Sequence, residues 1–478
     1  MQFPQQGRAA TEILDQLDAF KAGDLPWAEG RVFAYVYDAG PVAMQLLKEA
    51  YSTFLVENGL DPTSFPSCLE LERQVIGMAL DLQQGGTGAA GNFTSGGTES
   101  ILLSIKTARD RARDLYPGIK TPNIVIPETG HSSFFKACHY FDVDAVTVPV
   151  DPTTYCAIPA DMEAAINDQT ILMVGSAPSY AHGSVDPIPE LGEICQRHDI
   201  LLHVDSCVGG MYLPFAKELG VDIPDFNLAV PGVTQLSMDF HKWGYAAKGA
   251  SAILYNDAAM RDYQVWSWSG WTGYSVINPT VLSTKSGGPV AACWATLQHL
   301  GRDGYLELVA TCQDASARII DAIESMPALR VLGEPKTNLF SIASDTIDVF
   351  ALADDMKARG WYIQPQFGFS NSPANLHLSV GANNAPHVDA FTRDLGDCAA
   401  DLQARNVSGL RELPEEMAAL FDADNRGDML TALGAATGID PDNLPERMDG
   451  INNLLNQMPP RVRDKVLADF LNRLYASR

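Results

Sequence analysis

Short apolar runs alternate with amphipathic segments along the middle of the chain. Between about residues 70 and 255, five runs are rich in Val, Ile and Leu, and segments with helical periodicity, such as 99–116, lie between them. Short apolar runs that alternate with helices are typical of a mostly parallel sheet covered by helices. The predicted strands are 123–127, 145–150, 170–177, 200–205 and 251–256.

The pattern changes towards the C-terminus. Residues 287–323 read as long helices, and two strand-like stretches, within 331–344 and 375–381, then alternate with helical segments. This arrangement is typical of a small α+β unit. We predict an N-terminal segment 1–69, a large domain 70–324, a small C-terminal domain 325–404 and a helical extension 405–478.

Composition and net charge argue against some classes of binding partner and against a membrane protein. The chain has 478 residues, 46% of them hydrophobic, and a formal net charge of −26. Such an acidic surface argues against nucleic acid or an anionic membrane as a partner, because phosphates are bound by Lys and Arg. The sequence contains no apolar run near the roughly 20 residues that span a bilayer, and its first residues lack a signal-peptide core. We expect a cytoplasmic protein without a membrane span.

The eight cysteines are scattered and form no CxxC pair. This spacing favours reduced thiols in a cytosolic enzyme over a disulfide framework or a zinc site.

A glycine pair stands before the strongest predicted helix. The segment "NFTSGGTES" (92–100) places Gly96 and Gly97 among hydroxyl side chains at a helix N-terminus. Glycine lets backbone N–H groups approach an anion closely, and a helix N-terminus favours negative charge. The segment therefore indicates a phosphate site, although taken alone it is equally an ordinary turn and cap.

Two candidate residues follow predicted strands. His131 begins "HSSFFKACHYF" (131–141), and Asp205 ends the apolar run in "LLHVDSCVGG". Ligands of open α/β sheets bind beyond the carboxyl ends of the strands, so Asp205 is placed to face one. Taken alone, each is as consistent with a structural histidine or a turn aspartate.

Lys242 completes a set of groups. It lies 37 positions after Asp205, in "SMDFHKWGYAAKG" (237–249). A single lysine is usually a solvated charge. A phosphate cradle, a histidine, a strand-end aspartate and a lysine are together what a pyridoxal 5'-phosphate (PLP) enzyme requires. Lys242 would bond to the cofactor, Asp205 would keep the pyridine nitrogen protonated, and His131 would stack on the ring.

Further residues are predicted around the cofactor. Cys207 would touch the second face of the ring. The predicted phosphate contacts are Gly97, Thr98, Ser237 and His241, and Ser95 and Gly96 are predicted to bind the cofactor with them.

A competing interpretation takes His203, Asp205, Asp239 and His241 as metal ligands, because residues i and i+2 of a strand share a face. It leaves the glycine pair and Lys242 without roles, so we predict no metal.

These motifs resemble those of the fold-type I, PLP-dependent group II decarboxylase superfamily, most closely its sphingosine-1-phosphate lyase branch. The resemblance runs from about residue 30 to 400 and rests on "TSGGTES", "HSSFFKACHYF", "GSAPSYAHGSVDPI", "HVDSCVGG" and "SMDFHKWGYAAKG". It implies an α/β, PLP-dependent transferase-like large domain with a mostly parallel sheet, a small α+β domain and a homodimer with shared active sites. It also implies Lys242 as the cofactor lysine, Asp205 as the pyridine partner, and Lys248 and Tyr140 as catalytic residues near the substrate.

The chain differs from that branch at the substrate end. Asp61, in "NGLDPTSFPS" (58–67), stands where the family has a histidine, and Lys285 replaces an arginine in a loop that also contains Tyr274. A carboxylate repels a phosphate dianion, and lysine lacks the bidentate geometry of arginine. We predict Asp61, Tyr274 and Lys285 as substrate residues, with the substrate phosphorylated or not.

The preferred prediction is a carbon–carbon lyase that cleaves a β-hydroxy amine to an aldehyde and a smaller amine by retro-aldol chemistry. An L-amino-acid decarboxylase is the alternative, because both reactions use the same core residues. A non-catalytic PLP-binding protein of the same fold is the third hypothesis. The predicted partner is a small amine or amino acid.

Overall fold

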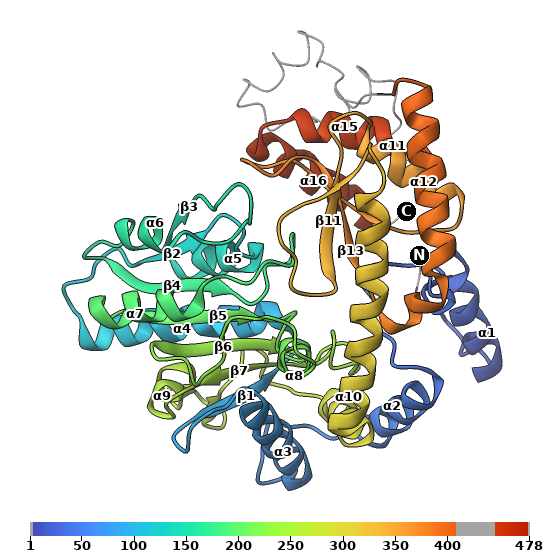
Figure 1. Cartoon of the computed structure of the whole chain (residues 1–478). Helices are drawn as coiled ribbons and strands as arrows, with labels where there is room; N and C mark the ends of the chain where they lie inside the picture. The colour runs from blue at the N-terminus through green and yellow to red at the C-terminus, as the bar shows by residue number, and fades with distance from the viewer. Residues whose placement is uncertain (1–2, 408–444, 477–478) are drawn as a thin grey trace.

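A seven-stranded sheet forms the centre of the larger part of the molecule (Figure 1). The computed structural model describes residues 3–407 and 445–476. The strand order is β1-β7-β6-β5-β4-β2-β3, and β7 is antiparallel to both of its neighbours while the other pairs are parallel. The mostly parallel sheet predicted from the sequence is confirmed. Its strands are β1 (Ala90–Thr94), β2 (Asn123–Pro127), β3 (Asp144–Val148), β4 (Thr170–Ser176), β5 (Leu201–Ser206), β6 (Val233–Asp239) and β7 (Ser251–Tyr255).

Helices cover both faces of this sheet. Ile124 and Ile126 of β2 pack into one core with α4 and α5, whereas Val125 packs into the core on the opposite face with α3, α7 and α8. Because both faces are covered, β2 is buried along its whole length, which explains its continuous apolar sequence. The helices are α3 (Pro66–Leu82), α4 (Gly97–Leu115), α5 (Ser132–Phe141), α6 (Pro159–Ala164), α7 (Ile188–His198), α8 (Leu213–Glu218) and α9 (Ala259–Gln264).

A second, smaller sheet has its own core. Its four antiparallel strands lie in the order β10-β11-β13-β12, and α11 and α12 pack against it. The limits of the four segments predicted from the sequence stay a prediction. The elements are β10 (Arg330–Val331), β11 (Leu339–Ala343), α11 (Val349–Ala358), β12 (Gln364–Gln366), β13 (Asn375–Ser379) and α12 (Val388–Ala404).

One long helix, α10 (Gly287–Glu324), runs through both parts (Figure 1). Its first half contributes Val290 and Leu297 to the core of the large sheet, and its second half contributes Ile319 to the core of the small sheet. Gly301 interrupts the helix with a left-handed φ of 55°, a conformation that glycine adopts without a steric penalty.

The N-terminal segment also joins the two parts. After α1 (Ala10–Phe20), Val32 forms a parallel bridge with Tyr362, and Phe33 is buried in the core of the small sheet. The chain then passes Tyr37, which packs against the large core, and α2 (Pro41–Thr53) packs against α10.

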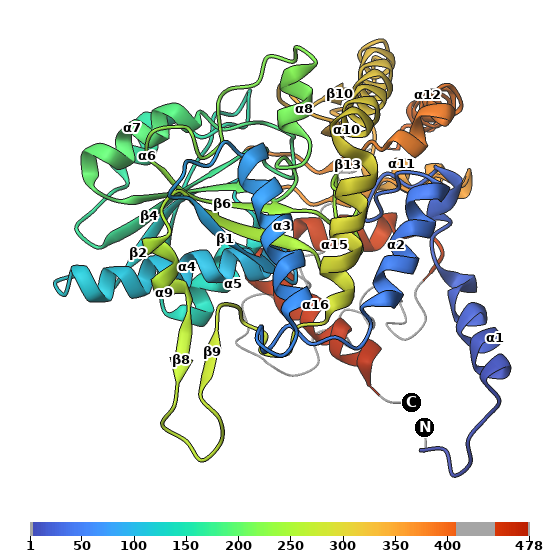
Figure 2. The same cartoon turned by 90° about the horizontal axis from the view of Figure 1, so that it is seen from below.

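Two further elements stand out. A hairpin of β8 (Trp266–Trp268) and β9 (Val276–Asn278) projects from the body of the molecule (Figure 2). Helices α15 (Asp449–Gln457) and α16 (Pro460–Tyr475) pack near α11. The helical tail was predicted from about residue 412, and residues 408–444 of it lie outside the described residues.

In the large sheet, the predicted strands agree with the structure to within two residues at each end, but the prediction omitted β1 and β6. The short strands β8, β9 and β12 were also not predicted. In β6, Gln235, Ser237 and Asp239 are all buried, so the strand does not show the apolar run that marks its neighbours. Across the described ranges, no helix is long and apolar enough to cross a membrane.

Candidate active site

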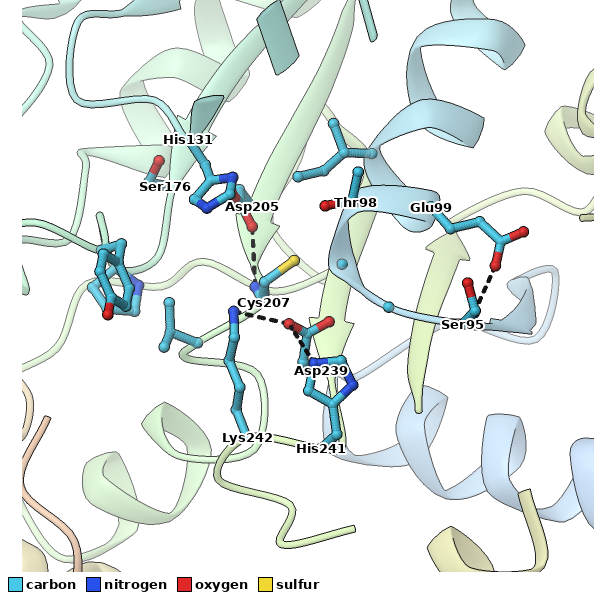
Figure 3. Close-up of a pocket in the computed structure, with 16 residues that line it drawn as sticks. Ser95, Thr98, Glu99, His131, Ser176, Asp205, Cys207, Asp239, His241 and Lys242 are labelled. Atoms are coloured by element: carbon cyan, nitrogen blue, oxygen red, sulfur yellow. Dashed lines mark hydrogen bonds and ion pairs between the residues drawn. The ribbon is translucent and has the colours of Figure 1, made fainter. Parts of the chain in front are cut away.

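A cavity of about 360 Å³ lies beyond the carboxyl ends of β5 and β6 (Figure 3). The end of β1, the start of α4 and the loop between β2 and α5 complete its walls. The structure brings most of the predicted cofactor residues together there. Those that line the cavity are Ser95, Gly96, Gly97, Thr98, His131, Asp205, Cys207, His241 and Lys242.

The glycine loop is shaped by close packing. A Cβ atom on Gly97 would lie 2.8 Å from Sγ of Cys207 and 2.9 Å from Oδ1 of Asp239, so a larger residue would not fit. Helix α4 begins at Gly97, and its N-cap Gly96 supplies no side-chain cap. The backbone N–H groups of the first turn are therefore left for another acceptor, such as an anion in the cavity.

Glu99 fixes this loop and was missed from the sequence. Its buried carboxylate accepts hydrogen bonds from the backbone N–H groups of Ser95 at 2.6 Å, Val281 at 2.7 Å and Leu282 at 3.2 Å. An acid in the first turn of a helix commonly binds backbone N–H groups of the preceding residues, and that signal was present in "SGGTES". Glu99 thus ties the glycine loop to the segment that follows β9.

Lys242 points into the cavity and is paired. Its Nζ lies 2.9 Å from Oδ2 of Asp239, the last residue of β6 (Figure 3). Burial alone would lower the pKa of Lys242, but the charge of Asp239 outweighs it and raises that pKa above its usual value. The pair also lowers the pKa of Asp239. Asp239 therefore keeps Lys242 charged in the protein as it stands, a role that the sequence did not predict.

Asp205 ends β5 and faces the same cavity. It accepts hydrogen bonds from the backbone N–H of Cys207 at 3.1 Å and from Oγ of Ser237 at 3.3 Å. Behind it, His203 lies between Oγ of Ser104 at 2.9 Å and Oγ of Ser237 at 3.0 Å. Burial lowers the pKa of His203 to about 4, so the ring is neutral at physiological pH. Two layers of hydrogen bonds thus fix the Asp205 carboxylate.

Ser237 corrects one prediction. It was expected to bind the cofactor phosphate, but its side chain is fully buried behind Asp205. Residues i and i+2 of a strand share a face, yet Asp239 reaches the cavity because it ends β6, whereas Ser237 lies further back along the strand. Ser237 therefore positions Asp205.

His131 caps α5 and lines the cavity. Its Nδ1 accepts a hydrogen bond from the backbone N–H of Ser133 at 3.2 Å and lies 3.0 Å from Oγ of Ser133. Oγ of Ser133 also lies 3.0 Å from Oγ1 of Thr98 in the glycine loop. His131 is exposed as a whole residue, but desolvation of its ring lowers its pKa, although Asp205 opposes the shift. The imidazole is thus held in one orientation and favours its neutral form.

Cys207 and His241 flank the glycine loop. Sγ of Cys207 lies 3.3 Å from Oγ of Ser237, and burial raises the pKa of the thiol well above its usual value. Nδ1 of His241 accepts a hydrogen bond from the backbone N–H of Ala250 at 3.2 Å, while its Nε2 lies 3.6 Å from Asp239. Cys207 is therefore a neutral thiol, and the His241 ring is fixed beside the loop.

Lys248 lies beside the cavity and not on its wall. Its Nζ donates hydrogen bonds to the backbone carbonyls of Tyr35 at 2.9 Å and His241 at 3.1 Å, and it sits 4.8 Å from the centre of the Tyr37 ring. Lys248 is exposed as a whole residue, but desolvation of its amine, together with the charge of Lys242, lowers its pKa to about 8. Its amine therefore loses a proton near physiological pH.

Tyr37 is a second residue that the sequence missed. Its ring packs edge-on against Trp243 at 4.7 Å, and Lys242 and Asp239 are close enough to affect its charge. Burial raises its pKa above the usual value, so the hydroxyl keeps its proton. Tyr37 comes from the segment before α2, and no spacing in the sequence links it to Lys242.

The structure does not bring Tyr140 to the site. The family resemblance implied Tyr140 as a catalytic residue near the substrate, but its side chain is 60% exposed on the outer surface of α5. Phe134, Ala137 and Cys138 form the buried face of that helix. The nearest cation is Lys136, 5.5 Å from the Tyr140 ring, one turn away on the same helix.

The three predicted substrate residues line a different cavity, of about 720 Å³. Tyr274 lies 62% exposed between β8 and β9, and Lys285 is paired with Glu72 at 2.9 Å. Asp61 accepts hydrogen bonds from Thr63 and Ser64, and these bonds lower its pKa to about 2. The cavity thus holds an ionised Asp61 and a Lys285 whose charge is already balanced.

The competing metal interpretation finds no support in the geometry. Both ring nitrogens of His203 are engaged by serine hydroxyls. Within residues 3–407 and 445–476, no group of three or more His, Cys, Asp or Glu side chains could hold a metal ion.

Two family descriptions match the chain. The pyridoxal-dependent decarboxylase conserved domain matches residues 2–341, and the C-terminal putative HTH domain of pyridoxal-dependent enzymes matches residues 411–473.

Individual relatives are lyases or decarboxylases by name. The chain is 38% identical to sphingosine-1-phosphate lyase of Oryza sativa subsp. japonica over 403 residues, which cover 83% of this chain and 74% of that relative. It is 31% identical to the probable L-aspartate decarboxylase of Pyrococcus furiosus, over 77% of this chain and 96% of that one. The solved sphingosine-1-phosphate lyase of Burkholderia pseudomallei superposes with a TM-score of 0.81 at 32% identity, over 91% of this chain and 97% of that one.

Proposed function

Because the chain belongs to the pyridoxal-dependent decarboxylase family, we propose that it is a PLP-dependent carbon–carbon lyase similar to sphingosine-1-phosphate lyase. It would cleave a β-hydroxy amine to an aldehyde and a smaller amine. The observation that carries the proposal is the convergence of Lys242, Asp205 and the N-terminus of α4 on one cavity, with Lys248 and Tyr37 beside it.

The residues around the cavity fit PLP. The N-terminus of α4 offers backbone N–H groups for a phosphate, and the packing around Gly97 leaves no room for a side chain. We propose that Ser95, Gly96, Gly97, Thr98 and His241 hold the phosphate.

When bound, PLP supplies an electron sink for the electron pair left by a bond that breaks at the substrate Cα. Asp205 would hold a proton at the ring nitrogen, and its two layers of hydrogen bonds keep the carboxylate in place. Lys242 would bond to the cofactor, and the negative charge of Asp239 beside it would stabilise a positive charge on its nitrogen. His131 and Cys207, both neutral, would contact the ring.

A retro-aldol reaction needs a base for the β-hydroxyl proton. Lys248 has a pKa of about 8, so a useful fraction of its amine is neutral at physiological pH. Tyr37 keeps its proton, and its ring lies beside the Lys248 amine, so it would hold that amine in place through a cation–π contact. We propose Lys248 as the base and Tyr37 as its partner. Tyr140, on the outer surface of α5, remains without a role in this chain's own cavity.

Product analysis tests the proposal. The purified holoenzyme is incubated with phosphorylated and unphosphorylated β-hydroxy amines and, separately, with L-amino acids. We expect an aldehyde and a smaller amine from a β-hydroxy amine. Release of CO2 with an intact amine, and no aldehyde from any compound, would overturn the lyase assignment.

An L-amino-acid decarboxylase is the second candidate. The family description names decarboxylases, and the chain is 31% identical to a probable L-aspartate decarboxylase. The acidic Asp61 and the balanced charge of Lys285 also weaken the case for a phosphorylated substrate. The same product analysis separates the two functions, because CO2 comes only from decarboxylation.

We also propose a homodimer with shared sites. The β8–β9 hairpin carries Trp266 and Trp268, each about half exposed, and every residue of α1 remains at least partly exposed. Apolar side chains on projecting elements are typical of association surfaces. Light scattering on the purified protein should give twice the chain mass, and a monomer at micromolar concentration would contradict this.

A cytoplasmic location completes the proposal. All eight cysteines are unpaired, and seven of them are buried, which suits a reducing compartment. Cell fractionation tests this, with secretion or membrane pelleting as the contrary result.

A further inference from the structure

A second cavity, of about 280 Å³, adjoins the cofactor cavity. His131 and Tyr180 line both cavities, so the two open onto the same side chains. Residues 128–131, which follow β2, form one wall of the second cavity, and residues 366–375, between β12 and β13, form another. It therefore lies between the large sheet and the small one.

Its walls carry polar atoms without partners. Within the described ranges, Nδ1 of His182, Oδ1 of Asn375 and Oγ1 of Thr129 are buried and form no hydrogen bond. His182 is 3% exposed and Asn375 is 1% exposed. Buried polar groups in folded proteins are nearly always hydrogen-bonded. All three atoms belong to residues that line one cavity, where a bound ligand would be the nearest source of the missing partners.

The His182 ring is held in place. It stacks on Tyr155, with ring centres 4.0 Å apart and planes within 8° of parallel, and its Nε2 lies 3.0 Å from Oγ of Ser372. Burial lowers the pKa of His182 to about 4, so the ring is neutral at physiological pH. One nitrogen is therefore engaged, and the other is left for a neutral hydrogen bond.

The charge of the walls limits the ligand. No lysine or arginine is among the described residues that line the cavity, and Glu128 is the acidic one among them. A phosphate or carboxylate would therefore meet an acid and no cation. A hydroxyl group both donates and accepts, so it matches a histidine nitrogen, an amide oxygen and a threonine hydroxyl.

We propose that this cavity is a substrate subsite that binds an uncharged, hydroxyl-bearing end of the substrate through His182, Thr129 and Asn375. The inference rests on the proposed function, since it takes the adjoining cavity to hold the reacting amine. It makes the substrate a polyhydroxylated amine whose distal hydroxyl lies between the two sheets.

The C-terminal helices hold one wall of this subsite. Arg463 of α16 lies 4.6 Å from the centre of the Phe367 ring, and the backbone N–H of Gly368 donates to Oδ1 of Asn456 in α15 at 2.7 Å. The part of the wall at Phe367 and Gly368 is therefore held in place by these helices, which suits recognition of one geometry.

The test is a pair of ligands that differ in one hydroxyl. Calorimetry on the holoenzyme measures the dissociation constants of 2-aminohexane-1,3-diol and its 6-hydroxy analogue. We expect the 6-hydroxy compound to bind about tenfold more tightly or better, because it satisfies buried groups that the other leaves unpaired. His182→Phe keeps the stacking on Tyr155 and should abolish the preference. Thr129→Val, at a less buried position, should reduce it.

His198→Phe is the matched control. His198 ends α7 and pairs with the partly exposed Glu163, so the preference should stay as in the wild type. Equal binding of the two amines by the wild type, binding of neither, or an unchanged preference in both subsite variants would overturn the inference.

Aldehyde formation is followed in parallel to separate the two proposals. A binding preference without any aldehyde would contradict the lyase proposal but not the subsite. Aldehyde formed without a binding preference would contradict the subsite but not the lyase proposal.

Discussion

The cofactor cavity and the cavity around Asp61, Tyr274 and Lys285 are built in opposite ways. In the first, the carboxylates of Asp205 and Asp239 lie at the ends of two strands beside a helix N-terminus, and they are buried and joined to their neighbours by hydrogen bonds and an ion pair. In the second, the side chains come from loops and a projecting hairpin; Asp61 and Tyr274 are exposed, and Lys285 is partly buried.

The difference lies in where each charge finds its partner. Lys242 and Asp239 form an ion pair that faces the cofactor cavity, so a ligand meets both charges. Asp61 binds its own turn, and Lys285 binds Glu72, so a ligand of the second cavity meets charges that are already satisfied. The chemistry of this chain is therefore rigidly built, while its loop-lined cavity offers little attraction to an anion.

The largest effect is expected from Lys242→Ala. The variant removes the amine that bonds to the cofactor, so aldehyde release should fall by about a thousandfold or more. Steady-state rates and the absorbance of the bound cofactor measure this. Lys217→Ala removes a surface lysine that is paired with Asp225 and serves as the control. A Lys242→Ala protein as active as the control would refute the assignment of the first cavity.

Asp205→Asn should lower kcat/KM by about a hundredfold. It keeps the side-chain size but removes the charge that holds a proton on the ring nitrogen. Ser237→Ala, which removes one hydrogen bond to Asp205, should cost no more than about tenfold. If Ser237→Ala proved the more damaging of the two, Ser237 would contact the cofactor directly.

Lys248→Gln should lower kcat/KM by about ten- to a hundredfold and change its pH dependence. The base is the neutral amine, which prevails above the pKa of about 8, so wild-type activity should rise as pH increases through about 8. The variant should lose this rise. Lys357→Gln, at the surface end of α11, is the control. A rise that persists in Lys248→Gln would assign the titration to another group.

The smallest effect is expected from Lys285→Met in the loop-lined cavity. Because Glu72 already balances Lys285, KM should change by less than about threefold, equally for phosphorylated and unphosphorylated amines. An increase of more than about tenfold for the phosphorylated amine alone would mean that Lys285 leaves Glu72 to bind phosphate.

Much of the architecture was predictable because both faces of the large sheet are covered. Strand β2 is apolar at nearly every position, and α4 carries a clear helical period, so their limits follow from the sequence. Asp205 was predictable for a related reason, since it ends such an apolar strand.

The misses have physical causes. Strand β6 turns Gln235, Ser237 and Asp239 inward to support the site, so it lacks an apolar pattern. Tyr37 packs against Trp243, next to Lys242 in the chain, and no local period encodes this contact between distant segments. Tyr140 shares a helix with the buried Phe134 but faces outward, and a motif match does not give the direction of a side chain.

Helix α10 has a consequence for thermal unfolding. Its two halves belong to the two cores, and Phe33 of the N-terminal segment is buried beside its second half. If one core unfolds, half of α10 loses its packing, and this destabilises the half that packs in the other core. We therefore expect both parts to unfold in one cooperative thermal transition. A mutation that weakens the core of the small sheet would then also lower the temperature at which the large domain and its cofactor cavity unfold, although the two sheets share no strand.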